Sequence, residues 1–403
     1  SIRRQRQMCI RDRDSDGDPD YYPYQTLYGL GYKNGSEAGA YFTVIANPSL
    51  KWETQISTDI ALEFGLFDRL TGTIEYFKKD SKDLLFDVSQ PASVGVTSII
   101  QNIGKVTNSG VEIELDYNAF KNKDWSVSVG ANATFVKNKI KNLPATMKEN
   151  GYISGSKKWL EGKSIYEFWL RQWHGVDPQT GDGLYVADVS KYNQGNIGTG
   201  DGNITQSQFD EYKKTVVTID GKELTNSYTY AKYDFSGSSI PDVYGGFNVR
   251  VSYKNFELAA VFSYQLGGQI LDTNYATMMS MTEFGYAQSP DLLKAWKQAG
   301  DITEVPRIDN SAAHTTNIGQ SYSTRWLTSS DYLNLRSVTI GYQLPKTWLS
   351  KVMLKSARLN LTAENLFMLK ARQGLNPMAN YSGVTYNEYM PSRNITLGLN
   401  VSF

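Results

Sequence analysis

The sequence has 403 residues and equal numbers of basic and acidic side chains, 41 of each, so its formal net charge is zero. This balance argues against nucleic acid as a partner, because nucleic-acid-binding surfaces carry clustered positive charge. The two histidines lower the expectation of hydrolytic or zinc chemistry, and the single cysteine excludes an internal disulfide. We therefore predict a protein that is not an enzyme and that needs no cofactor.

The mean hydropathy is −0.43, and no apolar run approaches the roughly 18 residues that a transmembrane helix needs. A membrane β-barrel stays compatible with these values, because its strands are only half apolar. Aromatic residues make up 13% of the chain and glycine occurs 34 times. That composition suits alternating strands joined by polar loops.

Residues 1–13, SIRRQRQMCIRDR, differ from everything that follows. The segment is basic but lacks the apolar stretch of a signal peptide, and it continues no later pattern. It resembles translated sequencing-adapter sequence, so we interpret it as a non-native head on a truncated gene, with a disordered basic arm as the alternative. Residues 14–46 are expected to form a loop that can include one strand.

Segments in which apolar and polar side chains strictly alternate recur from residue 54 to the end. Such a period of two is typical of strands with one buried and one wet face, and about 10 residues suffice for a tilted strand to cross a bilayer. We predict an all-β fold: the C-terminal part of a large antiparallel transmembrane β-barrel, with about 9–10 strands, against roughly 22 in large plugged transporters. The sheet should therefore be open in this fragment. The alternating segments are 54–64, 70–76, 111–117, 125–135, 247–253, 256–264, 338–342, 358–365 and 393–403.

The apolar sets predict which face meets lipid. In 111–117, 125–135, 247–253 and 395–403 the odd-numbered residues are apolar or aromatic, so we assign them to the lipid face. Glu112, Glu114 and Asp116 alternate with the first set and could be read as an acid/base or metal cluster. We interpret them instead as solvated side chains of a wet lumen.

Long polar connections alternate with very short turns along the chain. Outer-membrane barrels show this asymmetry, with short periplasmic turns and long extracellular loops, whereas most connections in soluble domains are short. The longest connection should fold on itself as a large extracellular loop region over the barrel mouth. The long connections are about 77–108, 138–242, 266–331 and 367–392, and the loop region is 138–242.

Two segments partly resemble calcium-binding loops. In Asp12–Asp18 the acidic spacing fits, but the position that needs a bidentate Glu falls on Pro23. In Gly198–Thr205 the outer ligand positions fall on Ile197 and Gln208. A solvated loop and a glycine-rich turn are the preferred interpretations, so no metal site is predicted.

Further motifs resemble the C-terminal barrel of the SusC/RagA family of TonB-dependent outer-membrane transporters of Bacteroidota-like bacteria. Seven occur in order along residues 47–403, and the resemblance covers the last third to half of a family member. They are Asn47–Thr54 (NPSLKWET), Asn102–Gly104 with Asn108–Glu112, Gly175–Gly181 (GVDPQTG), Pro241 with Gly245–Gly246, Asp331–Arg336 (DYLNLR), Gly341–Pro345 (GYQLP) and Glu364–Phe367 (ENLF).

This resemblance implies import of oligosaccharides, or less often peptides, across the cell outer membrane. It also implies a SusD-like surface lipoprotein and the TonB energy-coupling complex as partners, with outer-membrane lipids around the barrel. The family's plug and TonB box would lie upstream of this fragment. A structural or adhesive outer-membrane β-barrel without transport is the alternative, and the upstream sequence would distinguish the two.

Substrate contact in this part of the protein is predicted to come from aromatic residues of the 138–242 region, because aromatic faces stack on sugar rings and long loops carry function. The alternative is that these residues only pack the loop region. The terminal Phe403 is predicted to act as an assembly signal, with a role as a simple membrane anchor as the alternative. The aromatic candidates are Trp159, Tyr166, Trp169, Trp173 and Tyr185.

A helix is also expected to start at Ser289, which is followed by Pro290 and Asp291. A serine cap, a proline in the first turn and an early acidic residue all favour a helix N-terminus. We expect Leu292, Leu293 and Trp296 to share one face and to pack the loop.

Overall fold

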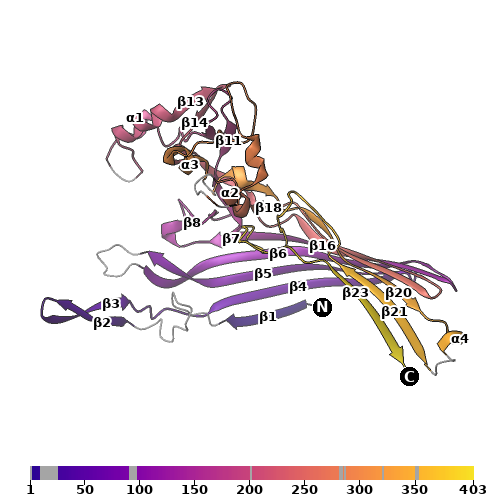
Figure 1. Ribbon diagram of the computed structural model, residues 1–403. Helices are drawn as coiled ribbons and strands as arrows, with labels where there is room; N and C mark the ends of the chain where they lie inside the picture. The colour runs from indigo at the N-terminus through magenta and orange to yellow at the C-terminus, as the bar shows by residue number, and fades with distance from the viewer. Residues whose placement is uncertain are drawn as a thin grey trace.

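The computed structural model consists of one long curved sheet and a folded loop region above one of its edges (Figure 1). Among the residues it describes, no helix is both long and apolar enough to cross a bilayer. The described residues are 2–9, 26–89, 98–199, 202–280, 285, 287–319, 322–349 and 354–403.

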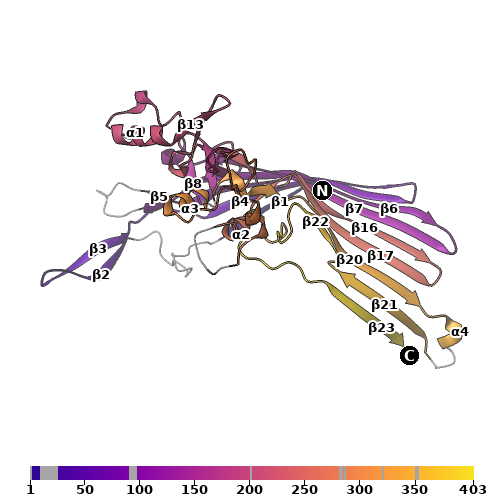
Figure 2. The ribbon, with the colours of Figure 1, turned by 45° about the horizontal axis from the view of Figure 1, so that its top comes forward.

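The main sheet has eleven strands in the order β1-β4-β5-β6-β7-β16-β17-β20-β21-β23, with β22 pairing the end of β20. Neighbours are antiparallel throughout. Within the described residues β1 and β23 do not pair, so the sheet is open, as predicted (Figure 2). The strands are β1 (Ile2–Cys9), β4 (Glu53–Leu66), β5 (Leu70–Ser89), β6 (Ser98–Lys121), β7 (Trp125–Asn142), β16 (Val243–Tyr253), β17 (Phe256–Leu266), β20 (Tyr332–Gln343), β21 (Ser356–Glu364), β22 (Met368–Lys370) and β23 (Asn394–Ser402).

The pairing register places the predicted apolar sets on one face of the sheet. Residues directly opposite each other on antiparallel strands share a face, and one row of such partners runs unbroken from β6 to β23. Large apolar side chains on this face are exposed, for example Ile395 at 72% and Leu397 at 68%, which marks an interaction surface rather than a soluble exterior. The row is Tyr117, Val129, Val249, Ala260, Val338, Ala363 and Ile395.

Along the apolar band, the charged residues lie on the opposite face. Glu75 and Glu112 are direct partners across β5 and β6. Farther along the sheet, Glu257 accepts a hydrogen bond from the Arg358 guanidinium, with Nη2 to Oε2 at 2.8 Å, and its Oε1 lies 3.6 Å from Arg250 Nε. This wet face fits the predicted lumen.

Aromatic side chains border the apolar face at the edge formed by the short turns. Trp125 and Tyr253 pack with ring centroids 4.3 Å apart, and Phe256 and Tyr342 pack at 4.5 Å. From Trp125 to Phe135 the apolar face of β7 extends about 33 Å along the strand, or ~25 Å in height at a tilt of about 40°. This height matches the apolar band of a membrane barrel.

The short turns are tight, as predicted. Phe67 and Asp68 both have positive φ, at 56° and 52°, and Arg69 N donates to the Leu66 carbonyl at 3.1 Å. Two consecutive positive φ angles are the signature of the turn that matches strand twist in a two-residue hairpin.

The predicted long connection at 77–108 is largely strand instead. β5 continues to Ser89 and β6 starts at Ser98, so the hairpin extends far beyond the apolar band. The alternation was lost in this stretch because the outer face there no longer meets lipid and carries polar residues. The inner face packs on the loop region, where Val106 and Phe86 lie against the buried cluster of Ile140, Leu143 and Met147.

The predicted helix start at Ser289 is confirmed, since Ser289 Oγ accepts from Asp291 N at 3.3 Å. The element is a short 3-10 helix, η5, and it does not form the predicted face. Leu292 is buried, Leu293 is 79% exposed and Trp296 lies beyond the helix. A 3-10 helix turns once every three residues, so neighbouring leucines point apart.

The remaining elements lie outside the main sheet. Two small four-stranded sheets, β15-β10-β9-β8 and β11-β12-β14-β13, dominate the loop region, and β2 and β3 form a separate hairpin. Their bounds are β2 (Leu27–Asn34), β3 (Glu37–Val44), η2 (Ala145–Met147), β8 (Tyr152–Ser154), β9 (Lys157–Trp159), β10 (Glu167–Arg171), β11 (Trp173–Val176), β12 (Gly183–Val186), η3 (Gln194–Asn196), α1 (Gln206–Thr215), β13 (Val216–Ile219), β14 (Lys222–Thr225), η4 (Tyr228–Tyr230), β15 (Tyr233–Ser238), β18 (Gln269–Leu271), α2 (Thr273–Met278), η5 (Pro290–Lys294), α3 (Ala312–Ile318), η6 (Thr324–Trp326), β19 (Leu327–Ser329) and α4 (Lys346–Leu349).

We predict that arginine is tolerated on one face of the main sheet only. Val129→Arg and Leu399→Arg place a charge on the apolar face and should each lower the free energy of unfolding by about 2–4 kcal/mol near the bilayer midplane. Ser128→Arg and Asn400→Arg point to the wet face and should cost far less. Denaturant unfolding of the full-length protein in lipid measures this difference; equal costs on both faces would contradict the assignment.

We also predict that Phe403 is needed for assembly. Phe403 follows the last residue pair of β23, Ser402 with Ser356, and is 79% exposed. In the full-length protein, Phe403→Ala should reduce the amount of heat-modifiable barrel in the outer membrane well below that of Val401→Ala. Equal assembly of the two variants would leave Phe403 as an anchor at the membrane boundary.

Candidate functional site

The loop region is attached to the main sheet through side-chain amides. Asn138, near the end of β7, donates from Nδ2 to Asn108 Oδ1 at 2.7 Å. Its Oδ1 accepts from Ser164 Oγ at 3.0 Å and from Ile165 N at 2.9 Å. Asn138 is buried, so these bonds satisfy polar atoms that would otherwise be costly to bury, and they fix where the loop region starts.

A second amide connects two of the motif segments. Asn102 accepts a hydrogen bond from Lys51 N at 2.8 Å and donates to the Lys51 carbonyl at 2.6 Å. It also donates to the Asp83 carbonyl at 2.8 Å. The side chain thus replaces a backbone partner where β4 begins, which gives the asparagine in the N-I-G motif a physical role.

Two of the five predicted aromatic residues, Tyr185 and Trp173, pack against each other inside the loop region. Tyr185 is fully buried and its hydroxyl donates to the Asn317 carbonyl at 2.7 Å; burial raises the pKa of Tyr185 to about 12. Trp173 packs edge-on against Tyr185 at 5.1 Å, under the Arg325 guanidinium at 4.7 Å. Tyr185 therefore has no free face for a ligand.

The other three are half-buried. Trp169 stacks toward Tyr233 at 6.2 Å and has Lys158 Nζ 4.1 Å from its ring centroid. Trp159 packs with the core cluster around Ile140. Tyr166 packs edge-on against Tyr381 at 5.4 Å. Each retains exposed surface, so ligand contact by these residues and by Trp173 stays a prediction.

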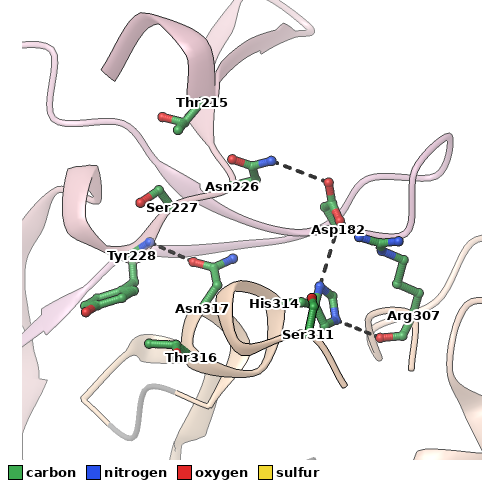
Figure 3. Close-up of a pocket in the computed structure, with 10 residues that line it drawn as sticks. All are labelled: Asp182, Thr215, Asn226, Ser227, Tyr228, Arg307, Ser311, His314, Thr316 and Asn317. Carbon is green, nitrogen blue, oxygen red and sulfur yellow. Dashed lines mark hydrogen bonds and ion pairs between the residues drawn. The ribbon is translucent and has the colours of Figure 1, made fainter. Parts of the chain in front are cut away.

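A polar cavity of about 630 Å³ lies between two segments of the loop region (Figure 3). One wall comes from the 138–242 region and the other from α3 and the strand-free segment before it, so residues far apart in the sequence face each other. The lining residues are Asp182, Thr215, Asn226, Ser227, Tyr228, Arg307, Ser311, His314, Thr316 and Asn317.

The charged side chains at the cavity form ion pairs with one another, so positive and negative charges offset each other. Arg307 Nε donates to Asp182 Oδ1 at 3.1 Å, and its Nη2 lies 3.1 Å from Asp309 Oδ2. His314 is buried; its Nε2 lies 2.8 Å from the Arg307 carbonyl, which can only accept, and its Nδ1 lies 3.9 Å from Asp182 Oδ1. The Ser311 backbone N–H, donating to the Asp309 carboxylate, lowers the pKa of Asp309.

Amides and hydroxyls provide the rest of the lining. Asn226 Nδ2 donates to Asp182 Oδ2 at 3.4 Å, and Asn317 Oδ1 accepts from Tyr228 N at 2.6 Å. Because the guanidinium is already paired with two carboxylates, the cavity has no excess positive charge for an anionic ligand. Its mixture of donors and acceptors suits a neutral ligand rich in hydroxyl or amide groups.

The cavity adjoins the predicted aromatic group through Arg171. The guanidinium carbon of Arg171 lies 4.9 Å from the ring centroid of Tyr228, in the cavity wall, and 4.6 Å from that of Tyr233. Tyr233 in turn stacks toward Trp169. Trp169 therefore does not line the cavity and is connected to its wall only through Tyr233, Arg171 and Tyr228.

The G-V-D-P-Q-T-G motif holds the two walls together. Asp177 caps its own turn by accepting from Gln179 N at 2.8 Å. The Trp296 indole donates to the Pro178 carbonyl at 2.9 Å. Gly181 has φ of +73°, and a Cβ there would lie 2.4 Å from the Trp296 ring, so only glycine fits.

Sequence reasoning missed Asp182, Arg307 and His314 as a group. Their positions fall in separate polar stretches without periodicity, and only packing brings them together. The G-V-D-P-Q-T-G motif next to Asp182 was the one signal that could have pointed to this place.

The structure describes the two calcium-like segments only in part. Asp12–Asp18 lies outside the described residues. Thr205 and Gln208 form a reciprocal capping box at the start of α1, so the side chain at the last position of the loop pattern serves the helix instead. Across the described residues, no group of three or more His, Cys, Asp or Glu side chains could hold a metal ion.

Comparisons with known proteins agree with this architecture. Residues 17–203 match the family model "TonB dependent receptor-like, beta-barrel". TonB-dependent receptor P3 of Formosa agariphila is 29% identical over 96% of this chain and 38% of its own length. TonB-dependent receptor SusC of Bacteroides thetaiotaomicron is 24% identical over 89% of this chain and 32% of its own length. The structure of the RagAB peptide transporter superposes with a TM-score of 0.74 at 24% identity, over 100% of this chain and 40% of that one.

An open antiparallel sheet with a lipid-facing band and long loops at one edge defines part of an outer-membrane β-barrel. The chain is thus similar to TonB-dependent receptors, including SusC, over most of its length, in agreement with the resemblance seen in the motifs. It spans well under half the length of the curated relatives it matches. Those relatives are receptors rather than enzymes, and their place is the outer membrane.

We predict that the β8–β10 sheet becomes more stable as the pH rises above neutrality. Burial lowers the pKa of Lys157 to about 7, partly offset by Glu167; its Nζ lies 3.1 Å from the Phe168 ring centroid and donates to the Tyr166 carbonyl at 2.9 Å. An unfolded lysine binds its proton up to about pH 10.4, so between pH 7 and that value the unfolded segment holds more protons and stability rises with pH.

Amide hydrogen exchange in this sheet, corrected for the intrinsic pH dependence, measures the effect on the full-length protein. The Lys157→Met variant removes the titrating group and should abolish the pH dependence. An identical pH profile in the variant would show that another group is responsible.

Proposed function

We propose that the full-length protein containing this chain imports oligosaccharides, or less often peptides, across the outer membrane. In this proposal it is the channel partner of a SusD-like surface lipoprotein and receives energy from the TonB complex. The observation that carries the proposal is the sequence similarity, because the chain matches proteins named as TonB-dependent receptors along nearly all of its length.

Two properties of the structure support a neutral substrate. The cavity between the loops is lined by paired charges, amides and hydroxyls, and a series of ring contacts leads from its wall at Tyr228 to the half-buried Trp169. Hydroxyl-rich sugars use both kinds of surface, hydrogen bonds around the ring edge and stacking on its face. Peptides remain the second substrate class, since the RagAB neighbour is named a peptide transporter.

The partner proposal rests on the position of the loop region. It lies above one edge of the main sheet (Figure 1), which is the extracellular edge of the barrel because the short turns lie at the other edge. A surface lipoprotein that captures substrate would have to deliver it on this side.

Uptake measurements on cells lacking the gene and complemented with the full-length protein test the proposal. Labelled neutral oligosaccharides, acidic oligosaccharides and peptides of similar length are compared. We expect restored uptake of a neutral class and dependence on TonB. A protein that assembles in the outer membrane but restores no uptake would support the alternative, a structural or adhesive barrel.

The same uptake assay tests which loop residues contact the substrate. Trp169→Ala, Trp173→Ala and Asn226→Ala should each weaken apparent substrate affinity by about three- to tenfold, the range expected for one aromatic or hydrogen-bonding contact. Tyr386→Ala, which removes an aromatic side chain 69% exposed elsewhere in the loops, is the matched control. Unchanged affinity in all three variants would assign these residues to packing alone.

A further inference from the structure

A lysine-rich surface lies on the outer face of the sheet directly beyond the lipid-facing band. Tyr76, Val111 and Phe135 form the last apolar row across β5, β6 and β7. Two residues farther along the strands, Ser109 is the direct partner of a lysine on each side. The residues of this lysine surface, all on the same face by register, are Lys78, Lys82, Lys105, Lys137 and Lys139.

Little negative charge offsets this surface. Asp80 is the one acidic residue in these rows of β5, β6 and β7; it pairs with Lys78 at 3.4 Å and accepts from Thr107 Oγ1 at 2.6 Å. In the part of the chain that the structure describes, the other four lysines form no ion pair within 4.0 Å. Five ammonium groups with one carboxylate leave a local excess of positive charge, which attracts an anionic partner.

The height of these lysines corresponds to the lipid head groups. At ~3.3 Å per residue and a strand tilt of about 40°, two and four residues beyond the apolar row correspond to ~5 Å and ~10 Å above the hydrocarbon. The polar zone of one leaflet is about 5–7 Å thick beyond the hydrocarbon. Lys78 and Lys137 therefore lie at head-group level, whereas the Lys139 backbone lies a few ångströms beyond it and only its long side chain reaches the head groups.

A recess of about 700 Å³ opens at the same place. It exists because β16 stops pairing with β7 at Thr134, opposite Tyr244, while β7 continues to Asn142. Tyr76, Val111 and Phe135 line it, as do Lys137 and Lys139, and Asp242 is the one acidic residue among its lining residues. An apolar base beneath a basic rim is complementary to an amphiphile with a negatively charged head.

We propose that the lysine surface binds the phosphate-bearing head group of an outer-leaflet glycolipid. The acyl chains continue down the apolar face below Tyr76, Val111 and Phe135. The phosphates lie between the ammonium groups of Lys78 and Lys137, and the Ser109 hydroxyl between them is a further donor. The site is continuous with the lipid interface of the barrel, and this continuity favours a membrane lipid over a soluble anion or a protein.

Lipid retention by the purified full-length protein tests the proposal. The protein is reconstituted in phosphatidylcholine bilayers containing bisphosphorylated lipid A, extracted, and analysed by native mass spectrometry. The variant with Lys78→Gln, Lys137→Gln and Lys139→Gln should retain at least about tenfold less lipid A, given the loss of three cations at the head-group surface. Heat-modifiability confirms that the variant is folded, and Lys139→Gln alone, with a smaller loss, replaces it if the triple variant does not assemble.

The matched control is the variant with Lys121→Gln, Lys123→Gln and Lys254→Gln, which removes the same charge at the short turns of the opposite edge and should retain lipid A normally. Equal retention by the two triple variants overturns the proposal. Equal retention of dephosphorylated lipid A by the wild-type protein overturns it too, since contact would then be purely apolar. Displacement of lipid A by inorganic phosphate at matched concentration would assign the lysines to a soluble anion and likewise overturn it.

Discussion

Backbone hydrogen bonding inside the bilayer is the constraint on which this structure depends. Hydrocarbon offers no partner for an amide N–H or carbonyl, so each membrane strand must pair along its length with a neighbour. The antiparallel ladder from β4 to β23 meets this requirement. Because successive side chains of a strand point to opposite faces, each position then faces either lipid or water. A shift of register by one residue in a single strand would move its polar set into lipid, which is why the row through Val129 and Ile395 continues without interruption.

Where the strands leave the bilayer, the ladder persists but side-chain chemistry changes. β5 and β6 continue to pair well beyond the apolar band, with polar groups outward and apolar groups such as Val106 inward, where the loop region covers them. The sheet thus serves as a rigid support above the membrane. Side-chain amides such as Asn138 and Asn102 complete the hydrogen bonding where regular pairing ends.

Electrostatics differ among the three surfaces that this support creates. On the wet face, Glu257 is shared between two arginines. In the loop cavity, Arg307 is paired with two aspartates, so the site stays near neutrality and suits uncharged ligands. On the outer face beyond the band, lysines outnumber carboxylates, so this surface carries an excess of positive charge. Basic and acidic side chains therefore occur on all three surfaces, and the balance between them differs from one surface to the next.

The sequence alone determined the membrane sheet, since the alternation in segments such as 125–135 and 395–403 is a local property that the ladder merely repeats. It also indicated the short turns, the cap at Ser289 and, through motifs such as G-V-D-P-Q-T-G, the resemblance to TonB-dependent transporters. Tertiary structure decided the rest. The strand character of 77–108 depends on the loop region that covers its inner face, and the meeting of Asp182 with Arg307 and His314 depends on two loops packing through Gly181 and Trp296. The burial of Tyr185, a residue chosen for its aromatic ring, likewise follows from its neighbours. The polar segments that meet in the loop region have no periodic sequence pattern, so their contacts cannot be predicted from local sequence.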